Sequence, residues 1–494
     1  MNAATQLVDA NRARGAKLAF IEHGGGKRTY EELARRTNQA GNALRALGVK
    51  RGDRVLMVMR DTLEFPAVFF GAIKLGAVPV PVNTLLKPDD YRHFLADSEA
   101  TAIVYSAALA ESVAPALGGQ KALVEGKDLE AVLDRASPEL EPAAVKADDI
   151  AFWLYSSGST GKPKGAMHRH HSLLDTAKLY AQPILGIRED DKVYSVAKLF
   201  FAYGLGNGMT FPLSVGATAV LLPDRPTPDL VMKVLREHQP TIFYGVPTLY
   251  AALVADEKNG RATASQKLRI ACSAGEPLPK HVGERFHQRF GAHILDGLGS
   301  TEMLHIFLSL RPDDPRYGTS GKPVPGYELR IVGEDGQPVK QGELGELIVR
   351  GPTAATGYWK NPEKSKWTFR GGWTYTGDKY TQDENGYYVY SGRSDDMIKS
   401  GGIWVSPAEV ESAIASHPAV LEAGVVGVAD PDGLLKPKAF VVLREGAKAT
   451  AEELRAFVKE RLAPYKTPRW VEFIEALPKT ATGKIQRYRL RERG

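Results

Sequence analysis

The stretch RVLMVMRDTLEFPAVFFGAIKLG, residues 54–76, decides the fold class. It begins with a short apolar run, RVLMVM, which is typical of a buried β-strand. Residues 63–76 then have the composition of a helix, and Gly76 is a common helix stop. A buried strand followed directly by a helix is the repeating unit of an α/β fold.

The same alternation continues to about residue 300. Further strands are expected at residues 101–106, 150–156, 192–197, 217–222, 241–246 and 269–275, with helices at 227–239 and 279–291. Strands that alternate with helices predict parallel sheets covered by helices.

The pattern of expected strands and helices changes twice after that region. From about residue 318, short strands are joined by turns, with Asp335-Gly336 and Asn385-Gly386 as hairpin signals. After Arg393, helices with cap signals at 406–417 and 450–463 accompany two further strands. We therefore predict an N-terminal domain over 1–393, with a β subdomain over about 318–393, and a C-terminal α+β domain over 394–494.

Composition and charge exclude several classes of protein. The chain has 494 residues, 43% of them hydrophobic and 25% charged, as in an ordinary soluble globular protein. Its net charge is +6, but residues 479–494 alone hold six Lys and Arg against Glu492. A basic tail beside an anionic ligand explains this distribution better than a nucleic-acid surface, so we expect no nucleic-acid partner.

Two further features concern the compartment. Cys272 is the single cysteine, so an intrachain disulfide is impossible, and we expect a cytoplasmic protein. The N-terminal stretch MNAATQLVDANRARG lacks the apolar core of a signal peptide.

Residues 199–223 carry no charge and are long enough to span a bilayer, but they include four glycines and Pro212. We expect a buried helix and a strand there, and no membrane contact.

The stretch YSSGSTGKPKG, residues 155–165, follows an expected strand and has the composition of a phosphate-binding loop. It is not a Walker A loop, because Ser156 takes the place of the first glycine and Pro163 follows Lys162. Its glycines and hydroxyls bring polar groups close to an anion, and Lys162 and Lys164 add positive charge. The alternative is an ordinary glycine-rich surface loop.

Four other motifs carry candidate chemistry. In DGLGSTE (296–302), Glu302 follows a strand, and a carboxylate beside phosphates usually holds Mg²⁺. Asp378 in YTGD is suited to ribose hydroxyls, while Arg393 in GRSDDMIKSGG and Lys484 in PKTATGKI supply cations. Each of these residues also has a plainer interpretation. Glu302 would be a charge at a helix start and Asp378 a turn residue. Arg393 would be a surface ion-pair partner and Lys484 a solvated lysine.

Taken together and in this order, the motifs resemble those of the acyl-adenylate-forming enzymes, which include acyl-CoA synthetases, peptide-synthetase adenylation domains and luciferases. The resemblance covers almost the whole chain. It implies a reaction in which a carboxylate attacks the α-phosphate of ATP and takes the AMP while pyrophosphate leaves. The expected cofactors are ATP, Mg²⁺ and coenzyme A.

The resemblance also implies roles for individual residues. Thr301 contacts the α-phosphate, Glu302 is the metal ligand, and Lys484 lies between the carboxylate and the α-phosphate. Asp378 binds the ribose, with Arg393 near ribose and phosphate; Lys484, Thr301, Glu302 and Arg393 form the catalytic set. The remaining expected nucleotide contacts are Ser156, Ser157, Ser159, Thr160 and Lys164 at the phosphates, and Gly275, Glu276, Pro277, Asp296 and Gly297 around adenine.

In this family the C-terminal domain is mobile and rotates before the thiol step. The resemblance implies that Asp395 is the hinge. It also implies a tunnel for the CoA thiol, lined by Lys399, Ser400, Gly401 and Gly402.

Two stretches narrow the choice of acid. KLFFAYGLGNG (198–208) and GLGSTEMLHIF (297–307) closely resemble benzoate–CoA ligases and 4-hydroxybenzoate–CoA ligases. That likeness implies an aromatic gate at Phe201 and a ring pocket formed by Ala202, Tyr203, Leu298, Gly299 and His305. Plain core packing is the alternative for the aromatic residues, and a satisfied buried histidine for His305. Tyr203 and His305 also suit a ring hydroxyl, so benzoate and 4-hydroxybenzoate are not separated.

The leading interpretation is an ATP-dependent ligase that joins a small aromatic acid to CoA. A second candidate is a stand-alone adenylation enzyme that loads the thiol of a carrier protein. A third is a nucleotide-binding regulator without catalysis, against which both Glu302 and Lys484 argue. The sequence predicts no oligomeric state.

Overall fold

The computed structural model describes residues 1–156, 163–400, 403–431, 435–479 and 485–493. The chain divides into two compact units. Unit 1 comprises Met1–Tyr317, Gly321–Glu328 and Val349–Thr374, and unit 2 comprises Gly318–Ser320, Leu329–Ile348 and Tyr375–Gly494. The predicted boundary after Arg393 falls within unit 2, and the division into domains at that position remains a prediction.

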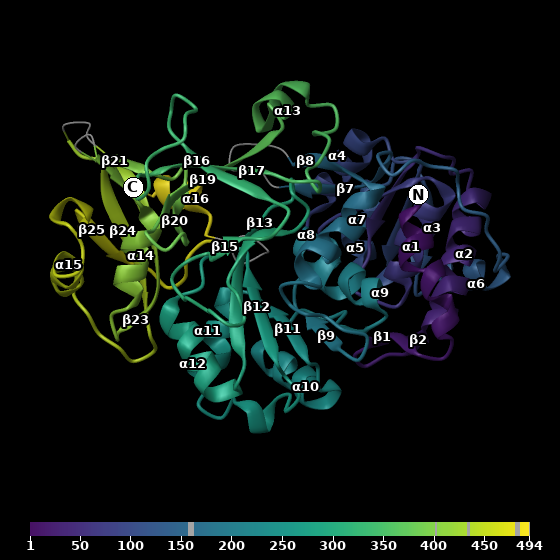
Figure 1. The fold of residues 1–494 in the computed structure, drawn as a ribbon, viewed down its shortest axis with the longest axis horizontal. Helices are drawn as coiled ribbons and strands as arrows, with labels where there is room; N and C mark the ends of the chain where they lie inside the picture. The colour runs from purple at the N-terminus through teal and green to yellow at the C-terminus, as the bar shows by residue number, and fades with distance from the viewer. Residues whose placement is uncertain (157–162, 401–402, 432–434, 480–484, 494) are drawn as a thin grey trace. The chain divides into compact units, whose positions relative to one another are not determined.

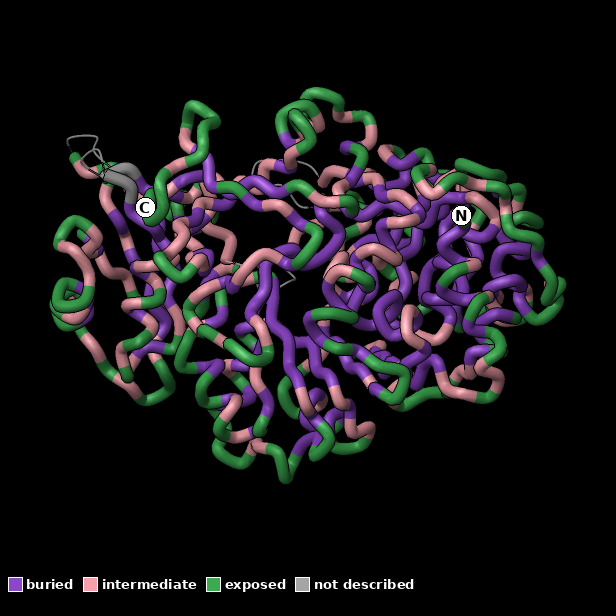
Figure 2. Tube along the Cα trace, viewed as in Figure 1, coloured by how far each residue is buried: buried purple, intermediate pink, exposed green. Residues whose placement is uncertain are grey.

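A nine-stranded sheet forms the centre of unit 1. Its strand order is β15-β14-β13-β12-β11-β9-β10-β1-β2, parallel from β13 to β1 and antiparallel at both edges. The strands are β1 (Leu18–Glu22), β2 (Lys27–Thr29), β9 (Lys192–Ser195), β10 (Thr218–Leu221), β11 (Ile242–Gly245), β12 (Ile270–Ala274), β13 (His293–Gly299), β14 (Ile306–Ser309) and β15 (Lys322–Pro323). Figure 2 shows the central strands as continuous buried segments, as the apolar runs predict.

Helices cover this sheet. α10 (Pro228–His238), α11 (Pro247–Ala255) and α12 (Lys280–Phe290) lie beside β11, β12 and β13 (Figure 1). Their apolar faces pack with the sheet in a core that includes Tyr194, Phe243 and Phe286. The predicted helices at 227–239 and 279–291 are therefore confirmed, and both end at a residue in the left-handed region.

A second parallel sheet contains the opening stretch. It has the order β4-β3-β5-β6, formed by β3 (Arg54–Val58), β4 (Val78–Pro81), β5 (Ala102–Ser106) and β6 (Lys121–Glu125). α3 (Glu64–Leu75) follows β3 and ends at Gly76, whose φ of 84° requires the freedom of glycine. The strand–helix unit predicted from residues 54–76 is confirmed.

One predicted strand pairs differently from the expectation. β7 (Ile150–Ser156) forms an antiparallel hairpin with β8 (Lys164–Arg169) and joins neither parallel sheet. The prediction of parallel pairing is wrong for this strand, because an apolar run shows burial but does not identify the partner strand. The hairpin places both ends of the predicted phosphate loop side by side.

The N-terminal segment 1–53 contains elements that the alternation from residue 54 does not predict. These are α1 (Ala3–Leu7), β1, β2 and α2 (Tyr30–Ala46). Thr29 and Glu32 form a capping box at the start of α2. Other helices of unit 1 are α4 (Pro88–Ser98), α5 (Ala110–Val113), α6 (Leu129–Arg135), α7 (His170–Thr176) and α13 (Pro362–Thr368), and β18 (Phe369–Arg370) is a short strand.

The uncharged stretch 199–223 is a buried helical segment followed by β10, as predicted. It consists of α8 (Ala202–Leu205), a π-helical turn (Gly206–Thr210) and α9 (Phe211–Val215). No helix in the described part of the chain has the length and apolar composition that a membrane crossing requires.

Unit 2 contains most of a small sheet and an α+β part. β16 (Glu328–Val332), β17 (Gly345–Arg350) and β19 (Trp373–Gln382) are neighbours in that order, and β20 (Tyr388–Arg393) pairs antiparallel with β19. The α+β part contains β21 (Ile398–Ser400), β22 (Ile403–Val405), α14 (Pro407–Ala415), β23 (Val420–Ala429), β24 (Leu435–Leu443), α15 (Ala451–Lys459), β25 (Trp470–Phe473) and α16 (Arg487–Arg491). Ser406 and Thr450 cap α14 and α15 as the sequence predicts.

Candidate active site

The hairpin β7–β8 carries the predicted phosphate loop. Ser156, the last residue of β7, lies opposite Lys164, the first residue of β8. The Lys164 ammonium lies 5.7 Å from the centre of the Tyr358 ring. Three predicted phosphate contacts, Ser157, Ser159 and Thr160, lie outside the described residues. The two that are described, Ser156 and Lys164, flank the loop on adjacent strands.

Glu302 lies just after β13 and is held by two hydroxyl groups. Ser156 Oγ donates to Glu302 Oε1 at 3.2 Å, and Tyr358 Oη donates to the same oxygen at 2.7 Å. Among the described residues, no side chain donates a hydrogen bond to Oε2. Two hydroxyl groups of the described residues therefore orient one carboxylate oxygen of Glu302. A carboxylate oxygen is a ligand that Mg²⁺ prefers, so this residue fits the predicted metal site.

Tyr358 is a site residue that the sequence motifs do not predict. The residue is buried and bridges to Ala166 of β8, so its segment runs along the edge of the hairpin. The backbone N–H of Ala355 also donates to the carbonyl of Glu302 at 2.7 Å. Because Tyr358 and Glu302 are far apart in the sequence, no local sequence pattern predicts their contact.

Thr301 is positioned through its backbone. His168 Nε2 donates to the Thr301 carbonyl at 2.8 Å, and the N–H of Leu304 donates to the same oxygen at 3.2 Å. Burial lowers the pKa of His168 to about 4, so the ring is neutral near pH 7 and can donate only from this nitrogen. Leu304 has a φ of 67°, an uncommon conformation for leucine. The hydrogen bonds to the Thr301 carbonyl thus hold the backbone of the turn that carries Thr301 and Glu302.

The predicted adenine segments meet at adjacent strand ends. Ala274 pairs with Gly297, and Gly275 leaves β12 with a φ of 99° and open space around its Cα. Glu276 and Pro277 follow in the same turn. Burial raises the pKa of Asp296 to about 7, and its Oδ2 accepts a hydrogen bond from the N–H of Leu278 at 3.3 Å. β12 and β13 therefore bring all five predicted residues toward the carboxyl ends of two neighbouring parallel strands, where α/β folds bind ligands.

The predicted ring pocket contains an aromatic group around His305. His305 Nε2 donates to the Tyr203 carbonyl at 3.3 Å, and its ring centre lies 5.6 Å from that of Tyr203 and 4.5 Å from that of Phe211. Burial lowers the pKa of His305 to about 3, so the imidazole is neutral. Its Nδ1, a buried acceptor, has no hydrogen-bond partner among the described residues. The interpretation of His305 as a fully satisfied core histidine is therefore incomplete.

The other predicted pocket residues lie on two nearby segments. Phe201 caps α8, Ala202 and Tyr203 begin it, and Leu298 and Gly299 end β13. A Cβ on Gly206 would lie 2.5 Å from His305, so only glycine permits this approach of the π-helical turn. His305 thus lies beside Tyr203 and Gly206, and its backbone lies beside Gly299.

A buried carboxylate also supports the segment before α8. Asp61 Oδ1 accepts a hydrogen bond from the N–H of Leu199 at 3.1 Å, and Lys198 Nζ lies 3.8 Å from Asp61 Oδ2. Lys198 Nζ also donates to the carbonyl of Asp224 at 2.8 Å. These contacts fix the chain just before the predicted gate, Phe201.

Within unit 2, Asp378 and Arg393 form a pair. They lie opposite each other on β19 and β20, and Arg393 Nη1 donates to Asp378 Oδ1 at 3.0 Å and to the Thr376 carbonyl at 3.0 Å. Asp378 is a strand residue, so its interpretation as a turn residue is wrong. The ion-pair interpretation of Arg393 is confirmed, and the pair presents a carboxylate and a guanidinium together.

The predicted hinge, Asp395, lies in the turn after β20. Its carbonyl accepts a hydrogen bond from Arg491 at 3.4 Å. The next residue, Asp396, contacts Arg487 at 3.5 Å, and Arg487 forms a bidentate pair with Glu411 of α14. Ion pairs therefore tie this turn to α14 and α16.

The remaining predicted residues are described only in part or not at all. Lys399 and Ser400 contribute their backbones to β21, and their side chains are not described. Gly401, Gly402 and Lys484 lie outside the described residues.

Comparison with known proteins adds independent evidence. Residues 7–359 match the family described as "AMP-binding enzyme", and residues 409–484 match its C-terminal domain. The chain is 55% identical to a benzoate–CoA ligase of Thauera aromatica, over 99% of this chain and 95% of the relative. It is 48% identical to a 4-hydroxybenzoate–CoA/benzoate–CoA ligase of Rhodopseudomonas palustris, over 99% and 94%.

A solved structure is also similar in fold. The anthranilate CoA ligase AuaEII, crystallised in complex with anthranoyl-AMP, superposes with a TM-score of 0.95 and 42% identity. The alignment covers 100% of this chain and 97% of that structure.

Proposed function

The chain belongs to the AMP-binding enzyme family, and we propose that it is an AMP-forming ligase that joins an aromatic carboxylic acid of benzoate size to coenzyme A. In the first step the acid and ATP give an acyl-adenylate and pyrophosphate. In the second step the CoA thiol displaces AMP and forms the thioester. The observation that carries this proposal is the full-length likeness to a benzoate–CoA ligase at 55% identity.

The site chemistry supports the first step. Hydrogen bonds from Ser156 and Tyr358 orient Glu302, which would hold Mg²⁺ through its second oxygen. When bound there, Mg²⁺ would neutralise charge on the phosphates of ATP. The Asp378–Arg393 pair would bind the ribose hydroxyls and the nearby phosphate, and Lys484 would offset the repulsion between the carboxylate and the α-phosphate.

The acid pocket supports a flat, small substrate. The rings of Tyr180, Tyr203 and Phe211 surround His305, with their centres 5.5 Å, 5.6 Å and 4.5 Å from that of the imidazole. Aromatic and small side chains of this kind suit a flat aromatic acid better than a long aliphatic one. The neutral Nδ1 of His305 would accept a hydrogen bond from a ring substituent that can donate one.

The second step requires a different arrangement of the C-terminal part. We infer that residues 394–494 rotate about Asp395, so that Lys484 and the segment 399–402 serve successive steps. Support comes from the change of texture after Arg393 and from the match of residues 409–484 to a separate C-terminal family domain. Because the single cysteine, Cys272, is buried and free, we also propose that the enzyme works in the reducing cytoplasm.

A substrate panel tests the proposal. With saturating ATP and free CoA, we expect the highest kcat/KM for benzoate or a singly substituted benzoate, and much lower values for cyclohexane carboxylate and octanoate. Octanoate turnover equal to that of benzoate would contradict the aryl specificity. Acid-dependent pyrophosphate exchange without any thioester from free CoA would favour the carrier-protein enzyme.

A single substitution tests the pocket itself. Ala202→Leu should overpack the ring site. The extra volume should cost about 1–3 kcal/mol and lower kcat/KM for benzoate about tenfold or more. Ala262→Leu, the same change at an exposed position, is the control. Equal kcat/KM in the two variants would remove Ala202 from the pocket.

A further inference from the structure

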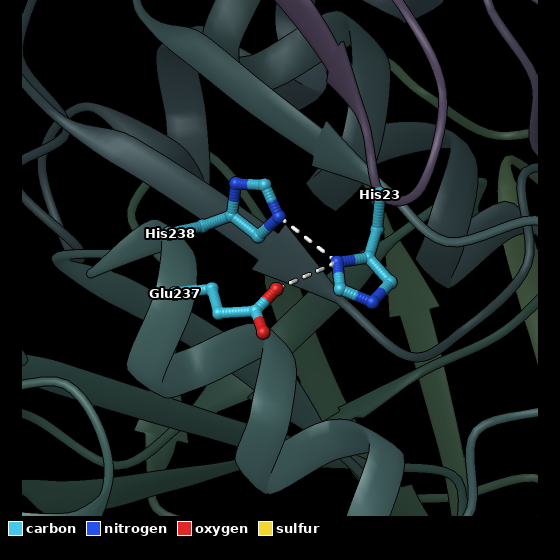
Figure 3. Close-up of side chains that lie close together, drawn as sticks. All are labelled: His23, Glu237 and His238. Atoms are coloured by element: carbon cyan, nitrogen blue, oxygen red, sulfur yellow. Dashed lines mark hydrogen bonds and ion pairs between the residues drawn. The ribbon is translucent and has the colours of Figure 1, made fainter.

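Three side chains that do not belong to the candidate active site lie close together (Figure 3). His23 Nδ1 lies 3.0 Å from His238 Nε2 and 3.8 Å from Glu237 Oε2. One ligand atom from each residue lies within 4.8 Å of the other two. His23 is distant in the sequence from Glu237 and His238, so the fold itself creates the cluster.

The backbone around each of the three residues is defined. His23 directly follows β1, and its N–H donates to the Leu221 carbonyl at the end of β10. Glu237 and His238 form the last turn of α10, whose other face is buried in the core. Two of the three side chains therefore lie on a packed helix, and a backbone hydrogen bond holds the third in the turn after its strand.

The two imidazoles share one hydrogen bond in the absence of a cation. One nitrogen must donate and the other must accept, so the ring edges that carry these two nitrogens face each other. Metal–nitrogen bonds of about 2.0–2.1 Å in a tetrahedral site place two ligand nitrogens about 3.3 Å apart. The observed separation of 3.0 Å needs only a small widening. A tautomer change in the donor ring would free both lone pairs.

We propose that His23, His238 and Glu237 form a binding site for a divalent transition metal of the zinc class, with water as the fourth ligand. Two imidazoles and a carboxylate are a common zinc ligand set. The site lies at the C-terminal end of α10, where the helix dipole favours a cation. A bound ion would clamp the end of β1 to α10.

Charged groups near the cluster both oppose and favour the binding of a cation. Lys192 Nζ donates to the His238 carbonyl at 2.9 Å, and Lys233 lies 4.0 Å from Glu237. The two lysine charges weaken the binding of a cation, and the carboxylate of Glu237 opposes them.

The experiment uses the full-length protein after treatment with a chelator, without ATP, and zinc chloride as the probe. We expect calorimetry to detect one zinc ion per chain in the wild type. His23→Asn and His238→Asn should each weaken binding at least about tenfold, and the double variant should lose it. Cobalt(II) should give the visible absorption of a four-coordinate ion in the wild type and not in the double variant.

Two further variants keep the test decisive. Glu237→Gln changes a half-exposed side chain, so it should fold normally and still weaken zinc binding about tenfold. His287→Asn removes one ring of the stacked pair His287–His293, whose centres lie 3.7 Å apart, and should bind zinc like the wild type. If the wild type binds zinc no more tightly than the double variant, the cluster is a hydrogen-bonded histidine pair and the proposal is wrong.

Discussion

Removing the Tyr358 hydroxyl should weaken the use of Mg²⁺ and ATP without unfolding the protein. In Tyr358→Phe, Glu302 Oε1 loses its hydrogen bond of 2.7 Å and, among the described residues, keeps the longer one from Ser156, at 3.2 Å. Tyr358 is 6% exposed, so water cannot readily replace the hydroxyl. The carboxylate would then rotate more freely, and its second oxygen would be less well placed for the metal.

The size of the effect follows from the type of bond. A hydrogen bond to a charged group contributes about 1.5–3 kcal/mol, which corresponds to a factor of roughly 10–150 in the affected step. Because this bond acts on the metal ligand, we expect a fall of about 10- to 100-fold in kcat/KM for MgATP in benzoate-dependent pyrophosphate exchange. The fall should be larger at low Mg²⁺ and smaller at high Mg²⁺.

Tyr327→Phe is the matched control. Tyr327 is also buried in unit 1, and its hydroxyl contacts Thr353 Oγ1 at 2.9 Å and not Glu302. Both variants lose one buried hydroxyl, so a purely structural cost should be similar in their melting curves. Only Tyr358→Phe should change the Mg²⁺ dependence of exchange. A Tyr358→Phe enzyme with wild-type kcat/KM at every Mg²⁺ concentration, or a loss independent of Mg²⁺, would refute this reasoning.

Three other changes have defined outcomes. The folded pKa of Asp296 is raised to about 7 against about 3.9 when unfolded, so this carboxyl costs stability as pH rises between those values. In urea titrations, the free energy of unfolding of Asp296→Asn should rise relative to that of the wild type by up to about 4 kcal/mol between about pH 4 and pH 8. A difference between the two proteins that does not change with pH would contradict the raised pKa. Lys484→Ala should slow pyrophosphate exchange ~10²- to 10³-fold but largely spare CoA consumption from supplied benzoyl-AMP, and equal losses would exclude a role confined to the first step. Asp395→Pro fixes φ and restricts Ser394, so adenylation should persist while thioester formation falls by orders of magnitude, and wild-type thioester rates would place the hinge elsewhere.

The sequence by itself determined the local elements and the family. Short apolar runs, the left-handed Gly76 and the Thr450 capping box are signals within a few residues, and the corresponding strand and helix ends were found. Ordered motifs such as DGLGSTE and YTGD carry the family likeness because the chemistry constrains neighbouring residues together.

Only the tertiary structure decided which distant residues meet. β7 pairs with β8 and not with a parallel strand, Tyr358 and Ser156 converge on Glu302, and His23 at the end of β1 meets His238 at the end of α10. Hydrophobic period and capping report the environment of a segment but not the identity of its partner, because many segments have the same period. Pairing depends on how whole sheets and helices pack, and that packing is a property of the complete chain.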